Sequence, residues 1–93
     1  MKQLEPTFTA KGFVHELVER TGNIAIYRRY KLGGGPEHFE TIKVGSHNGF
    51  KIPGTEKTTP PAEMYPSDKQ WGVKGWTFLD LADARKKAEE LLK

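Results

Sequence analysis

Residues 75–93, GWTFLDLADARKKAEELLK, carry the strongest secondary-structure signals in the chain. Asp80 stands at an N-cap position, where its carboxylate can accept a hydrogen bond from the free N–H groups of a first helical turn. Trp76 and Phe78 precede this cap, and we expect them to anchor the helix to a sheet. Apolar residues then recur at helical spacing and predict one apolar stripe, formed by Leu81, Ala84, Ala88 and Leu91.

Three strands are predicted upstream of this helix, at residues 13–20, 24–31 and 38–44, because β-branched and aromatic residues alternate with polar ones there. Glycine and asparagine between them provide turns. The segment Ser46-His47-Asn48-Gly49 is a further turn signal, after which the sequence allows a short fourth strand at 50–52. Four prolines in residues 53–66 exclude a helix and a central strand, and predict a surface loop.

The predicted fold is α+β, with an antiparallel sheet of three to four strands and one C-terminal helix packed on one face, in the order β-β-β-(β)-α. Residues 13–93 form the single domain, and residues 1–12 are expected to be an extended or frayed N-terminal arm. In the second strand, Ile24 and Ile26 share the face expected to meet the core, whereas the face of Arg29 and Lys31 is expected to meet water.

The composition narrows the classes of function. The chain has 93 residues and no cysteine, which removes disulfides, thiolate metal sites and cysteine nucleophiles. The net charge of +3 is too small to indicate a partner. No apolar run has the length of a signal peptide or a membrane span, so a cytoplasmic protein without membrane contact is expected. The three histidines lack zinc-ligand spacing and are interpreted as scattered surface residues: His15, His38 and His47.

Three segments of the chain resemble a family of small uncharacterised phage and prophage proteins. They are NIAIYRRY at 23–30, HFETIKV at 38–44, and MYPSDKQWGVKGWTF at 64–78 with the helix after it. The resemblance implies a phage or prophage origin and a location in the host cytoplasm, and it implies no activity. The order of three strands and a helix is also similar to plant ethylene-response-type and integrase arm-binding domains, but their dense Arg/Trp strand pattern is missing here.

The leading hypothesis is a non-enzymatic accessory protein that binds a host or phage protein, as a monomer or a homodimer and without a cofactor. Met64, Tyr65 and Trp71 lie on a segment framed by proline and glycine, where loops often present binding residues. Tyrosine and tryptophan are favoured interface anchors. The alternative for these rings is a lid on a small core, which is the interpretation we favour for Trp76.

A nucleic-acid-binding domain is the second hypothesis. Basic and aromatic residues on the second and third strands could neutralise phosphates and stack on bases: Tyr27, Arg28, Arg29, Lys31 and Lys43. Strand alternation divides these residues between two faces, which favours instead a solvated sheet surface with cross-strand pairs such as Arg29 with Glu16 or Glu40. An enzyme is the least favoured class, because no catalytic motif or cofactor fingerprint stands out.

Overall fold

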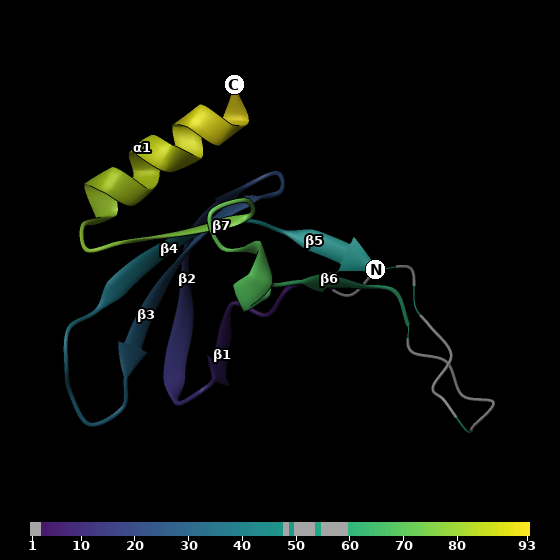
Figure 1. The fold of residues 1–93 in the computed structure, drawn as a ribbon, viewed down its shortest axis with the longest axis horizontal. Helices are drawn as coiled ribbons and strands as arrows, with labels where there is room; N and C mark the ends of the chain where they lie inside the picture. The colour runs from purple at the N-terminus through teal and green to yellow at the C-terminus, as the bar shows by residue number, and fades with distance from the viewer. Residues whose placement is uncertain (1–2, 48, 50–53, 55–59) are drawn as a thin grey trace.

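The computed structural model describes residues 3–47, 49, 54 and 60–93 of the chain (Figure 1). In chain order, the described elements are β1 (Thr7–Ala10), β2 (Phe13–Thr21), β3 (Ile24–Lys31), β4 (His38–Lys43), β5 (Gly45–His47), β6 (Ala62–Met64), the 3₁₀ turn η1 (Asp68–Gln70), β7 (Gly75–Phe78) and α1 (Leu81–Leu92).

Five of the strands form one antiparallel sheet in the order β1-β2-β3-β4-β7, and β5 pairs with β6 in a separate two-stranded ribbon. The helix α1 lies over one face of the large sheet, and the two-stranded ribbon projects from the side of this sheet (Figure 1). The predicted α+β class with one C-terminal helix is therefore confirmed, with five strands in the main sheet instead of three to four. None of the described helices is long and apolar enough to span a membrane.

The additional strands come from segments that the sequence analysis assigns to an arm, a turn and a loop, and from residues 75–78 before the helix, which form β7. Residues 7–10 pair with β2 through a two-residue turn, in which Lys11 and Gly12 have φ values of 54° and 82°. The turn prediction at Ser46-His47 is wrong, because these residues pair with β6. The loop prediction is likewise wrong at 62–64, which form β6 at the margin of the fold. The predicted strand at 50–52 lies outside the described residues.

The first hydrophobic core lies between α1 and the sheet. Ile24 and Ile26 contact Ala84 and Ala88, which confirms the predicted apolar stripe of the helix. The buried hydroxyl of Thr41 donates a hydrogen bond of 2.8 Å to the Ala84 carbonyl and adds a polar link between β4 and α1. Asp80 is the N-cap residue, but its side chain makes no capping hydrogen bond, so that detail of the prediction is wrong.

A second core lies on the opposite face of the same sheet. Ala25, Tyr27, Ile42 and Val44 are buried there, and five partly buried hydrophobic residues pack against them: Leu4, Phe8, Leu17, Tyr65 and Trp71. The expectation that the face of Arg29 and Lys31 meets water is therefore wrong at Ala25 and Tyr27, which are buried, whereas Lys31 at the end of the strand is exposed as predicted. Strand alternation identifies the two faces correctly, but it cannot show that segments distant in the chain return to cover the second one.

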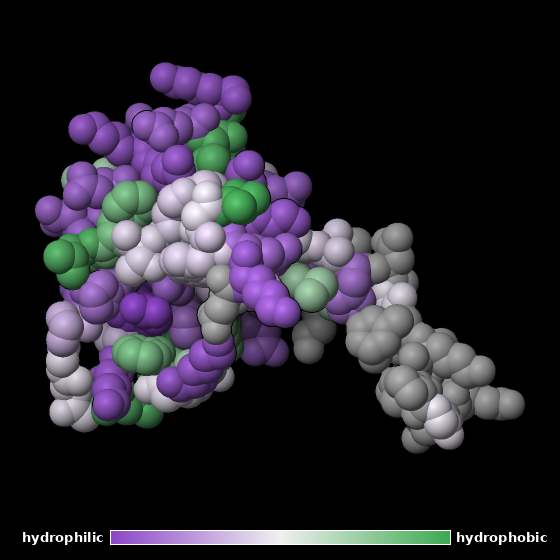
Figure 2. Space-filling view, in the orientation of Figure 1, coloured by the Kyte–Doolittle hydropathy of each residue, from purple (hydrophilic) through white to green (hydrophobic). Residues whose placement is uncertain are grey.

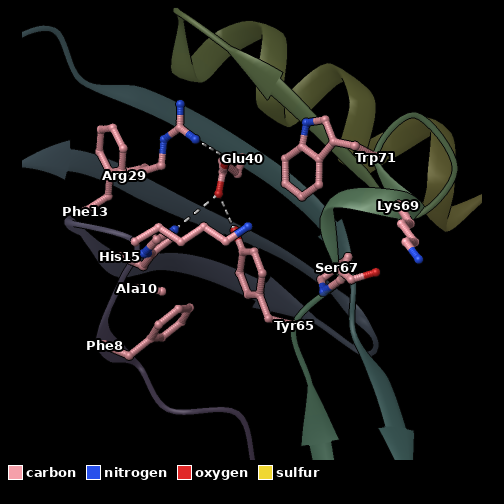
Figure 3. Close-up of a pocket in the computed structure, with 12 residues that line it drawn as sticks. Phe8, Ala10, Phe13, His15, Arg29, Glu40, Tyr65, Ser67, Lys69 and Trp71 are labelled. Atoms are coloured by element: carbon pink, nitrogen blue, oxygen red, sulfur yellow. Dashed lines mark hydrogen bonds and ion pairs between the residues drawn. The ribbon is translucent and has the colours of Figure 1, made fainter.

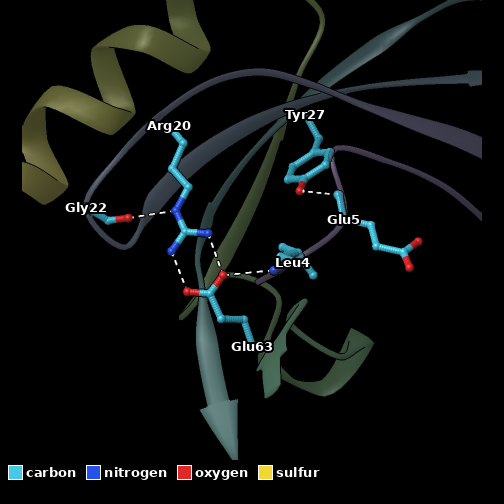
Figure 4. Close-up of polar contacts among 6 residues, drawn as sticks. All are labelled: Leu4, Glu5, Arg20, Gly22, Tyr27 and Glu63. Atoms are coloured by element: carbon cyan, nitrogen blue, oxygen red, sulfur yellow. Dashed lines mark hydrogen bonds and ion pairs between the residues drawn. The ribbon is translucent and has the colours of Figure 1, made fainter. Parts of the chain in front are cut away.

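The ribbon is fastened to the sheet by an ion pair between Arg20 and Glu63 (Figure 4). Two guanidinium nitrogens of Arg20 donate to the two carboxylate oxygens of Glu63 at 2.7 and 2.6 Å. The backbone N–H of Leu4 donates to the same carboxylate at 2.8 Å. These bonds join β2, β6 and the N-terminal segment. The hydrogen bonds from Arg20 and then from Leu4 lower the pKa of Glu63 from 4.5 to about 2.

Replacing Glu63 by glutamine should flatten the acid dependence of stability. Because the folded pKa is depressed, the ionised carboxylate stabilises the fold fully above pH 4.5, and this contribution is lost as the pH falls from there through about 2. Urea denaturation on both sides of pH 4.5 measures the slope. Arg20→Ala should cost about 1–3 kcal/mol near neutral pH, between the values for surface and buried pairs. Glu89→Gln on the exposed side of α1 is the control, and an equal flattening there would contradict this account.

Candidate functional site

The sheet face opposite α1 contains a pocket of about 820 Å³ (Figure 3). This volume lies within the range of roughly 300–1,000 Å³ that is typical of ligand-binding sites. Its walls come from β1, β2, β3, β4 and the segment between β6 and β7. The lining residues are Phe8, Ala10, Lys11, Phe13, His15, Arg29, Glu40, Tyr65, Pro66, Ser67, Lys69 and Trp71.

Glu40 of β4 lies at the base of the pocket, and its side chain is only 3% exposed. Its oxygen Oε1 accepts a hydrogen bond of 2.6 Å from the hydroxyl of Tyr65 and lies 3.5 Å from Nε2 of His15. Its oxygen Oε2 accepts a bond of 3.4 Å from the Thr77 hydroxyl and pairs with a guanidinium nitrogen of Arg29 at 3.2 Å. The negative charge is thus compensated, and both oxygens have partners within the protein.

Aromatic rings surround this carboxylate and pack against one another. Phe8 stacks on the imidazole of His15 with ring centres 4.6 Å apart. Tyr65 meets Phe8, His15 and Tyr27 edge-on, at 5.3 to 5.5 Å. Burial and the neighbouring carboxylate of Glu40 raise the pKa of Tyr65, so its hydroxyl stays protonated and remains a donor.

The indole of Trp71 forms another wall, and its position depends on Gly75. A Cβ atom added at Gly75 would lie 2.4 Å from a carbon of the Trp71 ring, which is closer than atoms can approach. Only glycine therefore allows the indole to lie against the start of β7. The ring nitrogen of Trp71 donates to Thr77 at 3.0 Å, and Thr77 in turn donates to Glu40.

Two of the three residues proposed for protein binding meet in this pocket. Tyr65 and Trp71 both line it, and both contact the second core. Met64 lies on β6, is 48% exposed, and does not line the pocket. Trp76 lies on the other face of the sheet, where the ammonium of Lys87 is 4.4 Å from its ring centre.

The residues of the nucleic-acid hypothesis are divided between the faces, as strand alternation predicts. Arg28 lies on the α1 face and pairs with Glu16 at 3.2 Å and with Glu37 at 3.1 Å. Arg29 lies on the pocket face, where its pair with Glu40 confirms the expected cross-strand contact. Both arginines therefore have acidic partners.

The other members of that set are also separated. Tyr27 is 1% exposed, and its hydroxyl donates to the carbonyl of Glu5 at 2.8 Å, so its ring has no face for a base. Lys31 follows Arg29 on the pocket face, whereas Lys43 lies opposite Ile24 on the α1 face.

His15 is the main site residue that the sequence analysis misses. The interpretation of scattered surface histidines is wrong for His15, which is 6% exposed, whereas His38 and His47 are half-buried. Burial lowers the pKa of His15, and the Glu40 carboxylate opposes this shift only in part. A signal existed in the sequence, because His15 shares its strand face with Phe13 and Leu17. For Glu40, no local sequence pattern predicts a buried carboxylate.

On the face shown in Figure 2, the described hydrophobic residues outside the pocket form no continuous patch. In the space-filling view, hydrophobic residues appear as separate small groups among hydrophilic ones (Figure 2). The most exposed of them are Leu32, Val73 and Leu79, at 70%, 66% and 74%. Among the described residues, no group of three or more His, Asp or Glu side chains is placed to hold a metal ion.

Comparison of the chain with known protein families, curated proteins and solved structures found no match. The resemblance to phage proteins therefore stays a prediction, and the site is interpreted from its geometry.

Tyr65→Phe should destabilise the fold by about 1–3 kcal/mol, because it removes a hydrogen bond to a buried charge while keeping the ring. The free energy of unfolding from urea denaturation measures this loss. Tyr30→Phe is the control, since the Tyr30 hydroxyl also donates to a glutamate, Glu16, but at a more exposed position. A smaller loss for Tyr65→Phe than for Tyr30→Phe would contradict the importance of the bond to Glu40.

The stability of the protein should fall as the pH drops below 6.5, the ordinary pKa of histidine. Because the folded state holds the pKa of His15 below that value, the unfolded chain binds this proton more readily. The stabilisation is complete above the unfolded pKa and declines toward the folded one. Urea denaturation at about pH 7.5 and pH 5.5 should show this slope in the wild type and in His47→Gln, and a reduced slope in His15→Gln. An unchanged slope in His15→Gln would contradict the assignment.

Proposed function

We propose that this chain is a non-enzymatic binding module, and that it takes side chains of a partner protein into the pocket opposite α1. One observation carries the proposal: Tyr65 and Trp71 converge with Phe8 and Phe13 on a single hollow of about 820 Å³. Concave aromatic sites of this kind accept apolar anchor residues, and tyrosine and tryptophan are the residues most often dominant in such interfaces.

The hydrogen bonding of Glu40 supports binding in preference to catalysis. A general base needs a lone pair that can reach a proton of the substrate. Here Tyr65 and Thr77 donate to the carboxylate, and Arg29 compensates its charge. Glu40 therefore acts in this proposal as a positioning group, which holds the surrounding rings in place. The neutral imidazole of His15, stacked on Phe8, contributes as a wall of the pocket.

The biological setting forms part of the same proposal and rests on the sequence resemblance alone. The chain would be an accessory protein of a phage or prophage, acting in the host cytoplasm on a host or phage protein. Modulation or inhibition of a host or defence protein is one concrete form of this activity. The test of the pocket is the same whether the protein is a monomer or a homodimer.

The test compares two tryptophan variants that lie on opposite faces of the sheet. A partner recovered from bacterial lysate with the tagged chain is identified, purified, and titrated against wild type, Trp71→Ala and Trp76→Ala. Trp71→Ala should weaken binding at least about 30-fold, the loss expected for an interface anchor worth ~2 kcal/mol. Trp76→Ala should change the affinity little. Circular dichroism establishes that both variants are folded.

Equal affinity of the wild type and Trp71→Ala would overturn the proposal. Nuclease treatment of the lysate distinguishes protein binding from nucleic-acid binding. If the material recovered with the tagged chain is mainly nucleic acid and is lost after nuclease treatment, the second hypothesis is favoured. That hypothesis also predicts a steep fall of affinity with salt and a loss in Arg29→Ala/Lys31→Ala. The acidic partners of Arg28 and Arg29 and the burial of Tyr27 weigh against it.

A further inference from the structure

We propose that the partner segment binds as an extended strand, which pairs with the outer edge of β1 and places one large apolar side chain in the pocket. This inference rests on the function proposed above and adds the way in which the partner is recognised. It is drawn from the backbone of β1, from the position of the pocket at that edge of the sheet, and from the inward packing of Phe8.

The outer edge of β1 has backbone groups that the sheet does not use. β1 is an outermost strand and pairs with β2 alone (Figure 1). Just before it, the N–H of Leu17 donates to the carbonyl of Pro6 at 2.7 Å, and hydrogen-bonded residues alternate along an antiparallel strand. The N–H and C=O groups of Thr7 and Thr9 therefore point away from β2. Within the described part of the chain no strand pairs with them, and both threonines are exposed.

The opposite edge of the sheet, at β7, is partly covered by the chain itself. The N–H of Gly72 donates to the carbonyl of Gly75 at 2.7 Å, and Trp71 forms an isolated bridge with the same residue. Proteins commonly protect open edges with a charged residue, a proline or a bulge in the strand. β1 contains neither a charged residue nor a proline, and its register with β2 is regular. Of the two edges, β1 is therefore the one suited to receive a further strand.

The pocket reaches the margin of the sheet at β1. Phe8 and Ala10 line it from this strand, across from Trp71 (Figure 3). Side chains that lie beside each other on neighbouring strands point to the same face of a sheet. Residues of an added strand beside Phe8 and Ala10, about 5 Å from β1, would thus point to the face that contains the pocket. Because Ala10 is small and exposed, a large side chain beside it can pass over it into the hollow.

Phe8 leaves this edge clear because its ring packs toward the middle of the sheet. It stacks on His15 of β2 with ring centres 4.6 Å apart and meets Tyr27 of β3 edge-on at 5.5 Å. The same packing argues against a second copy of this chain as the added strand. The Phe8 of a copy would be held on its own His15, so Ala10 would be the only apolar side chain that its β1 could offer to the pocket.

The partner segment therefore has a defined chemistry. It is an extended peptide without proline where its backbone pairs with Thr7 and Thr9, and it carries an aromatic or large aliphatic residue at a position that faces the pocket. In recognition by strand addition, the main-chain hydrogen bonds supply affinity and the pockets for alternate side chains supply specificity.

The experiment selects peptides and then scans their backbone. A library of random peptides displayed on yeast is sorted for binding to the wild type, and each enriched peptide is tested against Trp71→Ala. A peptide that depends on Trp71 is synthesised with one N-methyl group at each position in turn, which removes one N–H donor at a time. Binding should weaken about tenfold or more at the alternate positions whose N–H faces β1, and little at the positions between them.

Two substitutions at Thr9 test the same edge from the side of the protein. Thr9→Pro removes an N–H that points outward and takes no hydrogen bond from the pairing with β2, and it should weaken binding about tenfold or more. Thr9→Val keeps this N–H and the β-branched shape, and this control should bind as the wild type does. Circular dichroism establishes that both variants are folded, and the N-methyl scan decides the question if Thr9→Pro is not.

The possible outcomes separate this inference from the proposed function. A peptide that depends on Trp71 but shows no alternation in the N-methyl scan would overturn strand pairing and leave the proposed function standing. If no selected peptide depends on Trp71, strand pairing is also overturned, and the lysate partner titrated against Trp71→Ala decides the proposed function separately. Sedimentation of the chain without peptide detects a second copy at this edge. A wild-type dimer that Thr9→Pro converts into a monomer would overturn the choice of a peptide.

Discussion

The buried carboxylate of Glu40 is the constraint on which the arrangement of this protein depends. A charge in the interior costs several kcal/mol unless it is paired and hydrogen-bonded. The groups around it come from segments far apart in the chain: Arg29 of β3 pairs with it, Thr77 of β7 and Tyr65 beyond β6 donate hydrogen bonds to it, and His15 of β2 lies beside it. A fold that failed to bring these segments together would leave the carboxylate unpaired, so a single polar group helps to specify how distant segments meet.

The sheet carries a hydrophobic core on each of its faces, and the two are closed in different ways. On one face, α1 covers Ile24 and Ile26 by ordinary apolar packing. On the other face, no α-helix in the described part of the chain packs against the sheet, and Ala25 and Ile42 are covered by side chains from β1, β2, the N-terminal segment and the segment after β6. The aromatic rings held around Glu40 leave a hollow between them, whereas a helix packed on this face would fill the space. The candidate site is thus a direct result of how the second face is closed.

The sequence predicts the elements that carry regular patterns. The stripe from Leu81 to Leu91 and the alternation at 24–31 need only local spacing, and the structure places a helix and a strand there. Tyr65 and Trp71 could be selected as candidates because their proline- and glycine-rich surroundings are visible in the sequence. The burial of Glu40 could not be predicted, since the groups that make it tolerable come from strands and loops far along the chain. The strand at 7–10 was missed for a similar reason: Thr7, Phe8 and Thr9 suit a strand, but it is their pairing with β2 that distinguishes a strand from an extended arm.

The hydrogen bond from the backbone of Leu4 to Glu63 has a practical consequence for work with this protein. The same N-terminal segment continues into β1, which supplies Phe8 to the pocket. The C-terminus follows α1 on the other side of the sheet, away from the β5–β6 ribbon (Figure 1). A bulky fusion partner or surface linkage ahead of Leu4 would disturb the segment that continues into the wall of the pocket. Attachment after Lys93 leaves that wall undisturbed. The bond between Leu4 and Glu63 therefore favours immobilisation of the protein through its C-terminal end.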